Sequence, residues 1–285
     1  MYVVMGATGN VGGAVADALL AKGEAVTVLT RQPERASIWR DKGARIVQAD
    51  AEDTASLKAA FRSGKRAFLL NPPADPTGDT DSTERRTIAN ILAALDGSGL
   101  EKVVAASTYG AQPGEGIGDL STLWELEDGL RRQSIPAAIN RGAYYMTNWT
   151  GLAEGVRHSG KLQSMFPADM PIPMVSPRDL GEAAADRLVS PLEDVGVVYV
   201  EGPELYTPSD VADAFADALG REIGLEVTER GRWEETFRSL GFSDVAARSF
   251  TRMTAAIVDS DFDRQQAPRR GKVTLSEFVS SVLAA

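Results

Sequence analysis

Residues 2–13 are YVVMGATGNVGG, and this stretch decides the fold. The apolar run before Gly6 predicts a short buried strand, and apolar residues recur at helical spacing from Val11 to Leu19. The turn between them carries Gly6, Gly9 and Gly12. A turn without Cβ atoms lets a pyrophosphate approach the N–H groups and the positive dipole end of the following helix. The stretch therefore predicts a dinucleotide-binding turn, with a purely structural strand-to-helix turn as the alternative.

Strands and helices alternate after this turn. A second apolar strand at 25–30 completes a βαβ unit of about 30 residues, the context that the motif requires. Further strands are predicted at 44–48, 66–70, 103–106 and 137–140, with helices at 54–61, 83–95 and 120–133 between them. Such alternation predicts an α/β fold with a doubly wound parallel sheet, whose ligands lie at the carboxyl ends of the strands. A strand at about 195–202 is expected to return to this sheet.

Composition excludes several classes of protein. The 285 residues contain no cysteine and only one histidine, His158, so disulfides, thiol nucleophiles and multi-histidine metal sites are excluded, and no metal is expected. The net charge of −10 argues against nucleic acid as a partner. No apolar run approaches the ~20 residues that span a bilayer, and the N-terminal strand follows no basic region. We therefore expect no membrane insertion, no signal peptide and a cytoplasmic location.

The residues at the strand ends indicate which cofactor binds. Arg31 follows the second strand, where an acidic residue would bind the ribose 2′-hydroxyl of NAD and an arginine accommodates a 2′-phosphate. This favours NADP(H) over NAD(H), unless Arg31 is only a solvated loop cation. Asp50 follows the third strand and either accepts from the adenine amino group or caps the helix that begins near Thr54. Asn71 and Pro72 follow the fourth strand. They either form a flat wall beside the cofactor or simply terminate the strand.

The fifth and sixth strands lead to candidate catalytic and pocket residues. Ser107 and Tyr109 emerge where a substrate carbonyl would meet the cofactor, and their hydroxyls could bind it or donate a proton. Ordinary turn chemistry before Gly110 is the alternative. After the sixth strand, Tyr144, Tyr145 and Trp149 either line an apolar pocket beside the nicotinamide or form core between two domains.

The chain resembles the NmrA-like branch of the atypical short-chain dehydrogenase/reductases. The resemblance rests on GATGNVG at 6–12, LRRQSIPAAINRGAYYMTNW at 130–149, VSPRDLGEAAADRL at 175–188 and VYVEGPELYTPSDVADAFADALGR at 198–221. It implies an NAD(P)-binding Rossmann domain over 1–142 and a smaller mixed α/β substrate domain over 143–285. By the same resemblance the pyrophosphate is lined by Gly6, Thr8, Gly9, Asn10, Val11 and Gly12, the 2′-phosphate by Arg31, the adenine by Asp50, and the ribose-nicotinamide region by Asn71 and Pro72.

One departure from the wider superfamily concerns catalysis. None of the six tyrosines has a lysine four residues on, so the Tyr-x-x-x-Lys pair that supplies the proton in typical reductases is missing. The resemblance accordingly implies two functions. The first is an NADP(H)-dependent oxidoreductase that passes hydride to an apolar conjugated acceptor such as a quinone, with water or Tyr109 as the proton source. The second is a catalytically silent NAD(P)-sensing regulator. The C-terminal helices are expected to cover the cleft or to form a homodimer face.

Overall fold

A large parallel β-sheet organises the computed structural model, which describes residues 1–260 and 267–284. Its eight strands lie in the order β13-β10-β6-β5-β4-β1-β2-β3. Every neighbouring pair is parallel, and the order runs outward from β1 in both directions. The strands are β1 (Tyr2–Val4), β2 (Val26–Thr30), β3 (Arg45–Gln48), β4 (Arg66–Leu69), β5 (Lys102–Thr108), β6 (Ala137–Gly142), β10 (Gly196–Glu201) and β13 (Arg269–Arg270). The predicted doubly wound sheet is thereby confirmed.

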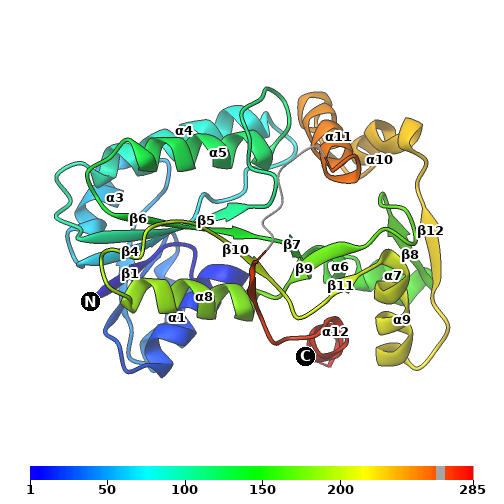
Figure 1. Ribbon diagram of the computed structural model, residues 1–285, viewed down its shortest axis with the longest axis horizontal. Coiled ribbons are helices and arrows are strands. Elements are labelled where there is room, and N and C mark those ends of the chain that lie inside the picture. Colours follow the sequence, from blue (N-terminus) through cyan, green and yellow to red (C-terminus); the bar gives the residue numbers. More distant parts are fainter. Residues whose placement is uncertain (261–266, 285) are drawn as a thin grey trace.

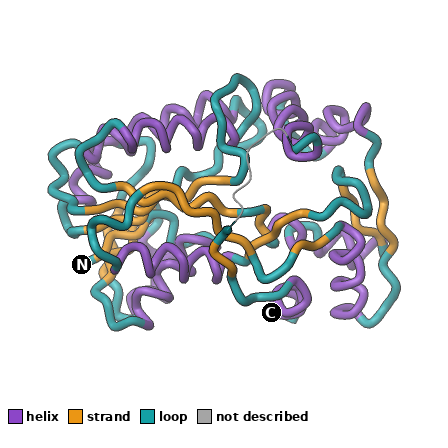
Figure 2. Tube along the Cα trace, in the orientation of Figure 1, coloured by secondary structure: helices purple, strands orange, loops and turns teal. Residues whose placement is uncertain are grey.

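Helices cover both faces of this sheet, as Figures 1 and 2 show. On one face α1 (Asn10–Ala21) and α8 (Pro177–Val189) pack against each other and enclose a core with Val15, Leu19 and Leu180. On the other face α3 (Thr54–Phe61), α4 (Thr80–Leu95) and α5 (Asp119–Arg131) enclose a second core. A short 3-10 helix (Pro33–Ala36) and α2 (Ser37–Asp41) connect β2 to β3. Because both faces are covered, β2 is buried along its whole length, and the inner strands β1, β4 and β5 are buried along most of theirs.

A smaller group of elements lies beyond the carboxyl ends of the strands. A mixed three-stranded sheet contains β7 (Tyr144–Tyr145), β9 (Ile172–Val175) and β11 (Leu205–Tyr206), and a two-stranded parallel sheet contains β8 (Lys161–Ser164) and β12 (Gly224–Val227). A third core lies among these elements. The surrounding helices are α6 (Thr147–Thr150), α7 (Ala153–Ser159), α9 (Pro208–Leu219), a 3-10 turn (Arg230–Arg232), α10 (Trp233–Ser239), α11 (Asp244–Val258) and α12 (Leu275–Leu283).

The large sheet takes strands from both sides of residue 142. Val197 of β10 pairs with Ile139 of β6, and Val200 of β10 pairs with Arg269 of β13. The helix α8 likewise packs on β4, β5 and β6. The chain therefore crosses between the large sheet and the smaller group of elements more than once, while the domain division at residue 142 stays a prediction.

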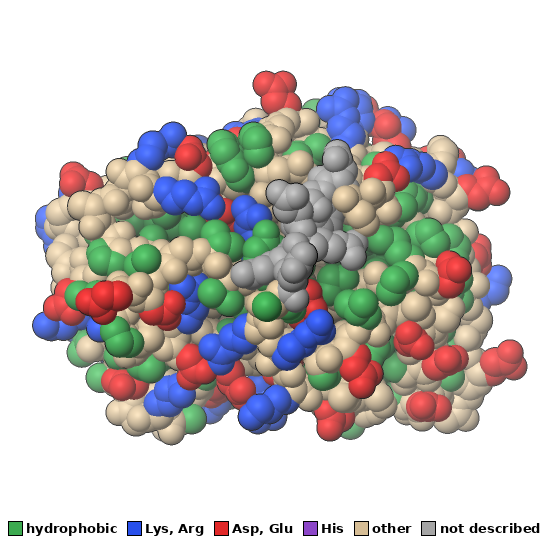
Figure 3. Space-filling view, viewed as in Figure 1, with side chains coloured by type: hydrophobic (Ala, Val, Ile, Leu, Met, Phe, Trp, Pro, Cys, Tyr) green, Lys and Arg blue, Asp and Glu red, His purple; other side chains and the backbone are tan. Residues whose placement is uncertain are grey.

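The charges on the surface and the lengths of the helices concern the partners that the sequence predicts. Acidic and basic side chains are interspersed on the face that Figure 3 shows. No helix in 1–260 or 267–284 combines the length and the apolar character needed to cross a bilayer.

Candidate functional site

Each glycine of the first turn has a different structural role. Gly6 has a φ of +68°, a left-handed conformation that favours glycine, and its carbonyl accepts the Gly9 N–H at 2.9 Å. A Cβ on Gly12 would lie 2.4 Å from the Gly6 carbonyl, so only glycine lets α1 pack this close to β1. Gly9 precedes α1, and no side chain caps that helix. The N–H groups of its first turn are therefore left for an anion.

A cleft of about 860 Å³ opens beside this turn, at the carboxyl ends of β1 to β4. Because parallel strands end at one edge of their sheet, residues far apart in the chain, from Met5 after β1 to Gly78 after β4, meet here. The volume lies within the range of ligand and cofactor pockets. Six of the residues predicted to bind the cofactor line it, namely Gly6, Thr8, Gly9, Arg31, Asp50 and Pro72.

The remaining four predicted cofactor residues do not line this cleft. Val11 is buried in the core under α1, and Gly12 serves the close packing of helix on strand. The Asn71 side-chain oxygen accepts a hydrogen bond from the Thr87 hydroxyl at 2.6 Å. Asn10 lines a different pocket, described next. Their roles toward a cofactor stay predictions.

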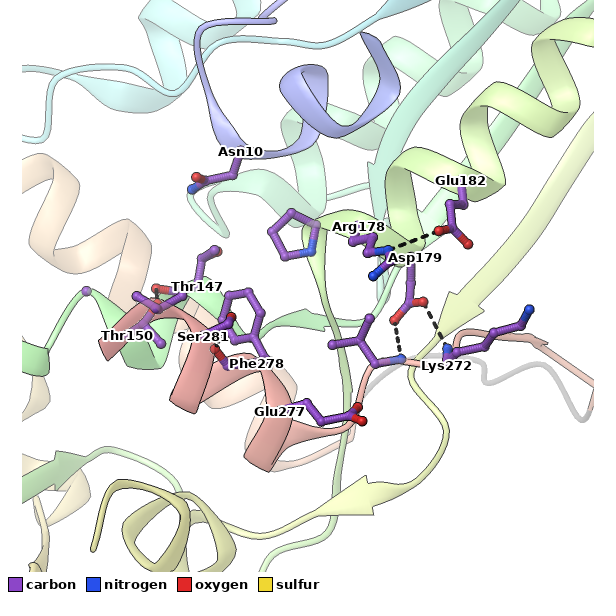
Figure 4. Close-up of a pocket in the computed structure, with 14 residues that line it drawn as sticks. Asn10, Thr147, Thr150, Arg178, Asp179, Glu182, Lys272, Glu277, Phe278 and Ser281 are labelled. Atoms are coloured by element: carbon purple, nitrogen blue, oxygen red, sulfur yellow. Dashed lines mark hydrogen bonds and ion pairs between the residues drawn. The ribbon is translucent and has the colours of Figure 1, made fainter. Parts of the chain in front are cut away.

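That second pocket, of about 950 Å³, lies among α1, α6, α8 and α12 (Figure 4). Its polar groups are largely engaged with one another. Arg178 Nε donates to Glu182 at 3.1 Å, and the buried Asp179 carboxylate accepts the backbone N–H groups of Lys272 and Val273. These contacts fasten the C-terminal segment to α8, and they identify no ligand.

Arg31 and Asp50 lie at the far end of the first cleft. Arg31 is exposed after β2, and none of the described residues accepts a hydrogen bond from its guanidinium. Asp50 accepts the backbone N–H of Glu52 at 3.0 Å. The cap of α3 is Asp53, whose side chain accepts from the first turn of that helix. A helix capped by Asp50 would begin directly after that residue, whereas α3 begins at Thr54, directly after Asp53. The alternative that Asp50 caps the helix is therefore wrong.

The hydroxyls of Ser107 and Tyr109 are both used inside the protein. Ser107 is 1% exposed and donates to Glu127 at 2.6 Å, and Arg141 donates twice to the same carboxylate at 2.8 Å. Tyr109 donates to Glu201. Burial, followed by the hydrogen bond to Glu201, raises the pKa of Tyr109 well above its ordinary value. Tyr109 is thus held as a neutral phenol.

Glu127 and Glu201 are site residues that the sequence did not reveal. They lie on α5 and β10, 20 and 92 residues from their hydroxyl partners. No local motif connects the members of either pair. Only an unusual acidic residue within the apolar β10 strand could have signalled Glu201.

The three aromatic residues after β6 have separate surroundings. Tyr144 contacts Phe166 edge to face, with ring centroids 5.2 Å apart, and burial raises the pKa of Tyr144 to about 12. Tyr144 also lines a small cavity of about 50 Å³, and its wall includes Thr108, Tyr109, Met170, Pro171, Ile172, Pro173 and Ile257. Trp149 is 2% exposed in the third core, and Tyr145 packs against the core under α1. Trp149 is thus a core residue of the smaller group of elements, and a place for Tyr144, Tyr145 and Trp149 beside a substrate stays a prediction.

In 1–260 and 267–284, no three acidic or histidine side chains come together in a way that could hold a metal ion.

The family model described as the NmrA-like family matches residues 2–263, over nine tenths of the chain. The chain belongs to the NmrA-like family. The match includes the glycine-rich turn, all strand ends of the cleft and the Tyr109–Glu201 pair.

Relatives of known name support the fold of this NmrA-like protein. A nitrogen metabolite regulation-like protein of Gibberella fujikuroi, bik4, is 25% identical over 281 residues, which cover 88% of this chain and 83% of that one. The triphenylmethane reductase of Citrobacter sp. has a TM-score of 0.79 at 22% identity, over 100% of this chain and 99% of that one. The NADPH-dependent quinone oxidoreductase QOR2 of Escherichia coli has a TM-score of 0.76 at 21% identity, covering 99% of each chain.

Proposed function

We propose that this NmrA-like protein is an NADP(H)-dependent oxidoreductase that transfers hydride to a small, apolar, conjugated acceptor such as a quinone. The observation that carries the proposal is the cleft, with an uncapped helix N-terminus at its glycine-rich turn and the exposed Arg31 on its wall. Two structural neighbours are named as reductases, one of quinones with NADPH and one of triphenylmethane dyes.

Each part of the cleft fits one part of the dinucleotide. The α1 N-terminus, with Gly6 and Gly9, would hold the pyrophosphate, and Arg31 would pair with the 2′-phosphate. Asp50 would accept from the adenine amino group, and Pro72 would form a wall beside the ribose. The bound cofactor supplies the hydride.

The protein's part in the reaction would be mainly positioning. An electron-poor conjugated system accepts hydride when the reacting atoms are held in contact and in line. The apolar cavity at Tyr144, next to the end of β5, would form one side of that surface, and at about 50 Å³ it would have to widen to admit the acceptor. Since the Tyr109 hydroxyl already donates to Glu201, and its raised pKa makes it a weaker acid than an ordinary phenol, we infer that solvent water supplies the proton.

The test is NADPH oxidation in the presence of a panel of benzoquinones, naphthoquinones, triphenylmethane dyes and enones. Heat-denatured protein and NADH serve as controls. We expect turnover with at least one quinone and a lower rate with NADH. Saturable NADPH binding without oxidation above background across the panel would refute the oxidoreductase.

A second function, an NAD(P)-sensing regulator, is favoured by one observation. The hydroxyls of Ser107 and Tyr109 are hydrogen-bonded to buried carboxylates, and the Tyr-x-x-x-Lys pair is missing. The Gibberella relative is named as regulation-like. This function predicts tight cofactor binding without turnover and a protein complex that depends on NADP+ or NADPH. Affinity capture that is the same with and without each nucleotide would exclude it.

A further inference from the structure

The loop after β4 is held from behind by the start of α11. Ser243 donates its backbone N–H to the Pro76 carbonyl at 2.9 Å and its hydroxyl to the Gly78 carbonyl at 2.7 Å. Asp75, Thr77 and Gly78 of the same loop line the candidate cofactor cleft, whereas no residue of α11 does. The helix therefore supports a cleft wall without facing the cleft.

A second contact ties α11 to the starts of two other helices. The Ser249 hydroxyl donates to Asp81 at 2.7 Å and accepts the Gly118 N–H at 2.9 Å. Asp81 lies in the first turn of α4, and Gly118 directly precedes α5. Ser249 is 3% exposed, so these hydrogen bonds have no competition from water, and one of them is to an acidic side chain.

The other end of α11 reaches the acceptor cavity. Ile257 in its last turn lines the cavity with Tyr109 and Tyr144. The 15 residues of α11 form a stiff rod about 22 Å long, given a rise of about 1.5 Å per residue. Phe250 packs against Phe237 and Phe242, which joins α11 to α10. Figure 1 shows the two helices together beside the loops that follow β4 and β5.

We propose that α11 positions both halves of the site, with Ser243 as the positioning residue for the cofactor loop, Ser249 for the starts of α4 and α5, and Ile257 as a wall of the acceptor cavity. This inference rests on the proposed cofactor and acceptor sites. We expect that occupation of either half shifts the position of α11 and thereby changes the affinity of the other half, and such a coupling is reciprocal.

Two substitutions at Ser243 separate this role from simple capping of α11. Ser243 also caps the helix, accepting the Ala246 N–H at 3.1 Å. Ser243→Asp keeps a good cap but cannot donate to the Gly78 carbonyl, whereas Ser243→Thr keeps both functions. NADPH affinity is measured by fluorescence titration, and melting temperature reports the cap. We expect Ser243→Asp to bind NADPH about five- to tenfold more weakly and Ser243→Thr to stay within about twofold of the unaltered protein.

The coupling is measured with NADP+ and 1,4-benzoquinone, which do not react with each other. In the unaltered protein we expect benzoquinone to shift the dissociation constant for NADP+, and in Ser243→Asp the shift is lost. Ile257→Ala raises KM for benzoquinone and leaves NADPH affinity unchanged. Should Ser243→Asp fail to fold, Ser249→Ala with an intact Ser243 tests the hold of α11 on the start of α4, which follows that loop.

The outcomes distinguish this inference from the proposed function. Unchanged NADPH affinity and retained coupling in Ser243→Asp would overturn the role of α11 while leaving the oxidoreductase intact. Absence of NADPH binding by the unaltered protein would overturn both. Binding without turnover would refute the oxidoreductase alone, because the affinities of the Ser243 variants still decide whether α11 supports the cofactor loop.

Discussion

Single residues at the strand ends are the candidates for binding and catalysis, and their partners decide what they can do. Arg31 is exposed in the cleft and is available to an anion. Ser107 and Tyr109 occupy equally prominent places in the sequence, yet their hydroxyls donate to Glu127 and Glu201. A polar residue at a strand end is thus open to a ligand or engaged in the structure according to a partner distant in the chain.

Arg31→Ala should weaken NADPH binding about ten- to hundredfold and leave NADH binding nearly unchanged. The reason is the loss of a charge-assisted hydrogen bond, worth about 1.5–3 kcal/mol, to a phosphate that only NADPH carries. Isothermal titration with both cofactors measures it, with Arg35→Ala as the control because Arg35 lies outside the cleft residues. Equal weakening for both cofactors would contradict a 2′-phosphate role.

Tyr109→Phe should keep kcat within about threefold, because removing a phenol that donates no proton to substrate removes little general acid catalysis, usually worth about 10²–10⁴-fold. Stability should fall by about 1–3 kcal/mol, since the Glu201 carboxylate loses its buried donor. Stopped-flow NADPH oxidation and thermal unfolding give the two values. A kcat loss of a hundredfold or more would identify Tyr109 as the proton donor.

The buried Glu84 carboxyl leads us to predict an unusual pH dependence of the free energy of unfolding. It is 4% exposed, and burial, then the nearby Asp119, raise its pKa from 4.5 to about 8. Between these values the unfolded chain is ionised while the folded carboxyl stays protonated, so stability falls as pH rises through this window. Asp81 and Arg85 also lie close to this cluster.

Glu84→Gln should flatten this decline and stabilise the protein by about 1–3 kcal/mol at pH 8, since one pKa unit corresponds to about 1.4 kcal/mol. Glutamine can still accept from the Thr122 hydroxyl, which lies 2.9 Å from Glu84. Urea unfolding at pH 5, 6.5 and 8 measures the slope, and the exposed Glu115→Gln is the control. A slope identical to that of the unaltered protein would refute the assignment.

At the scale of elements, the junction of β1 and α1 depends on backbone approach. Gly12→Ala would place a Cβ 2.4 Å from the Gly6 carbonyl and 2.5 Å from that of Met5. We expect a loss of about 3 kcal/mol or more in stability, because neither backbone segment can move without disturbing the core. Gly155→Ala in α7 is the matched control, since its Cβ meets nothing within 4 Å.

Gly155→Ala should stabilise the protein by about 0.5–1 kcal/mol, because alanine has the higher helix propensity and lowers the entropy of the unfolded chain. Chemical unfolding of both variants provides the comparison. A Gly12→Ala protein as stable as the unaltered one would show that α1 can separate from β1 at little cost.

At the scale of the whole molecule, the C-terminal segment joins the large sheet to the smaller group of elements. Arg270 forms an ion pair with Glu201 at 2.9 Å, and α12 packs on α9. Between them the Asp179 carboxylate accepts the N–H groups of Lys272 and Val273 and the Ser176 hydroxyl. The segment thus passes from β13 to the third core through one buried carboxylate.

Asp179→Ala should release the C-terminal segment and cost about 2–4 kcal/mol, since it leaves two backbone donors and a hydroxyl without their acceptor. Limited proteolysis should then remove α12 early in the digestion. Mass spectrometry identifies the products. The exposed Asp213→Ala on α9 is the control. Unchanged cleavage kinetics would show that other contacts hold the segment.

A homodimer and a cytoplasmic location stay predictions.

The sequence by itself determined the sheet, the glycine-rich turn and the strand-end residues Arg31, Asp50 and Pro72, because these depend on local periodicity and on the rule that parallel strands end together. Tertiary structure alone decided that α8 packs on the large sheet and that β13 joins it, that Glu127 and Glu201 take the hydroxyls of Ser107 and Tyr109, and that Trp149 is core. Such contacts join residues far apart in the chain, and packing selects them among many partners of equal chemistry.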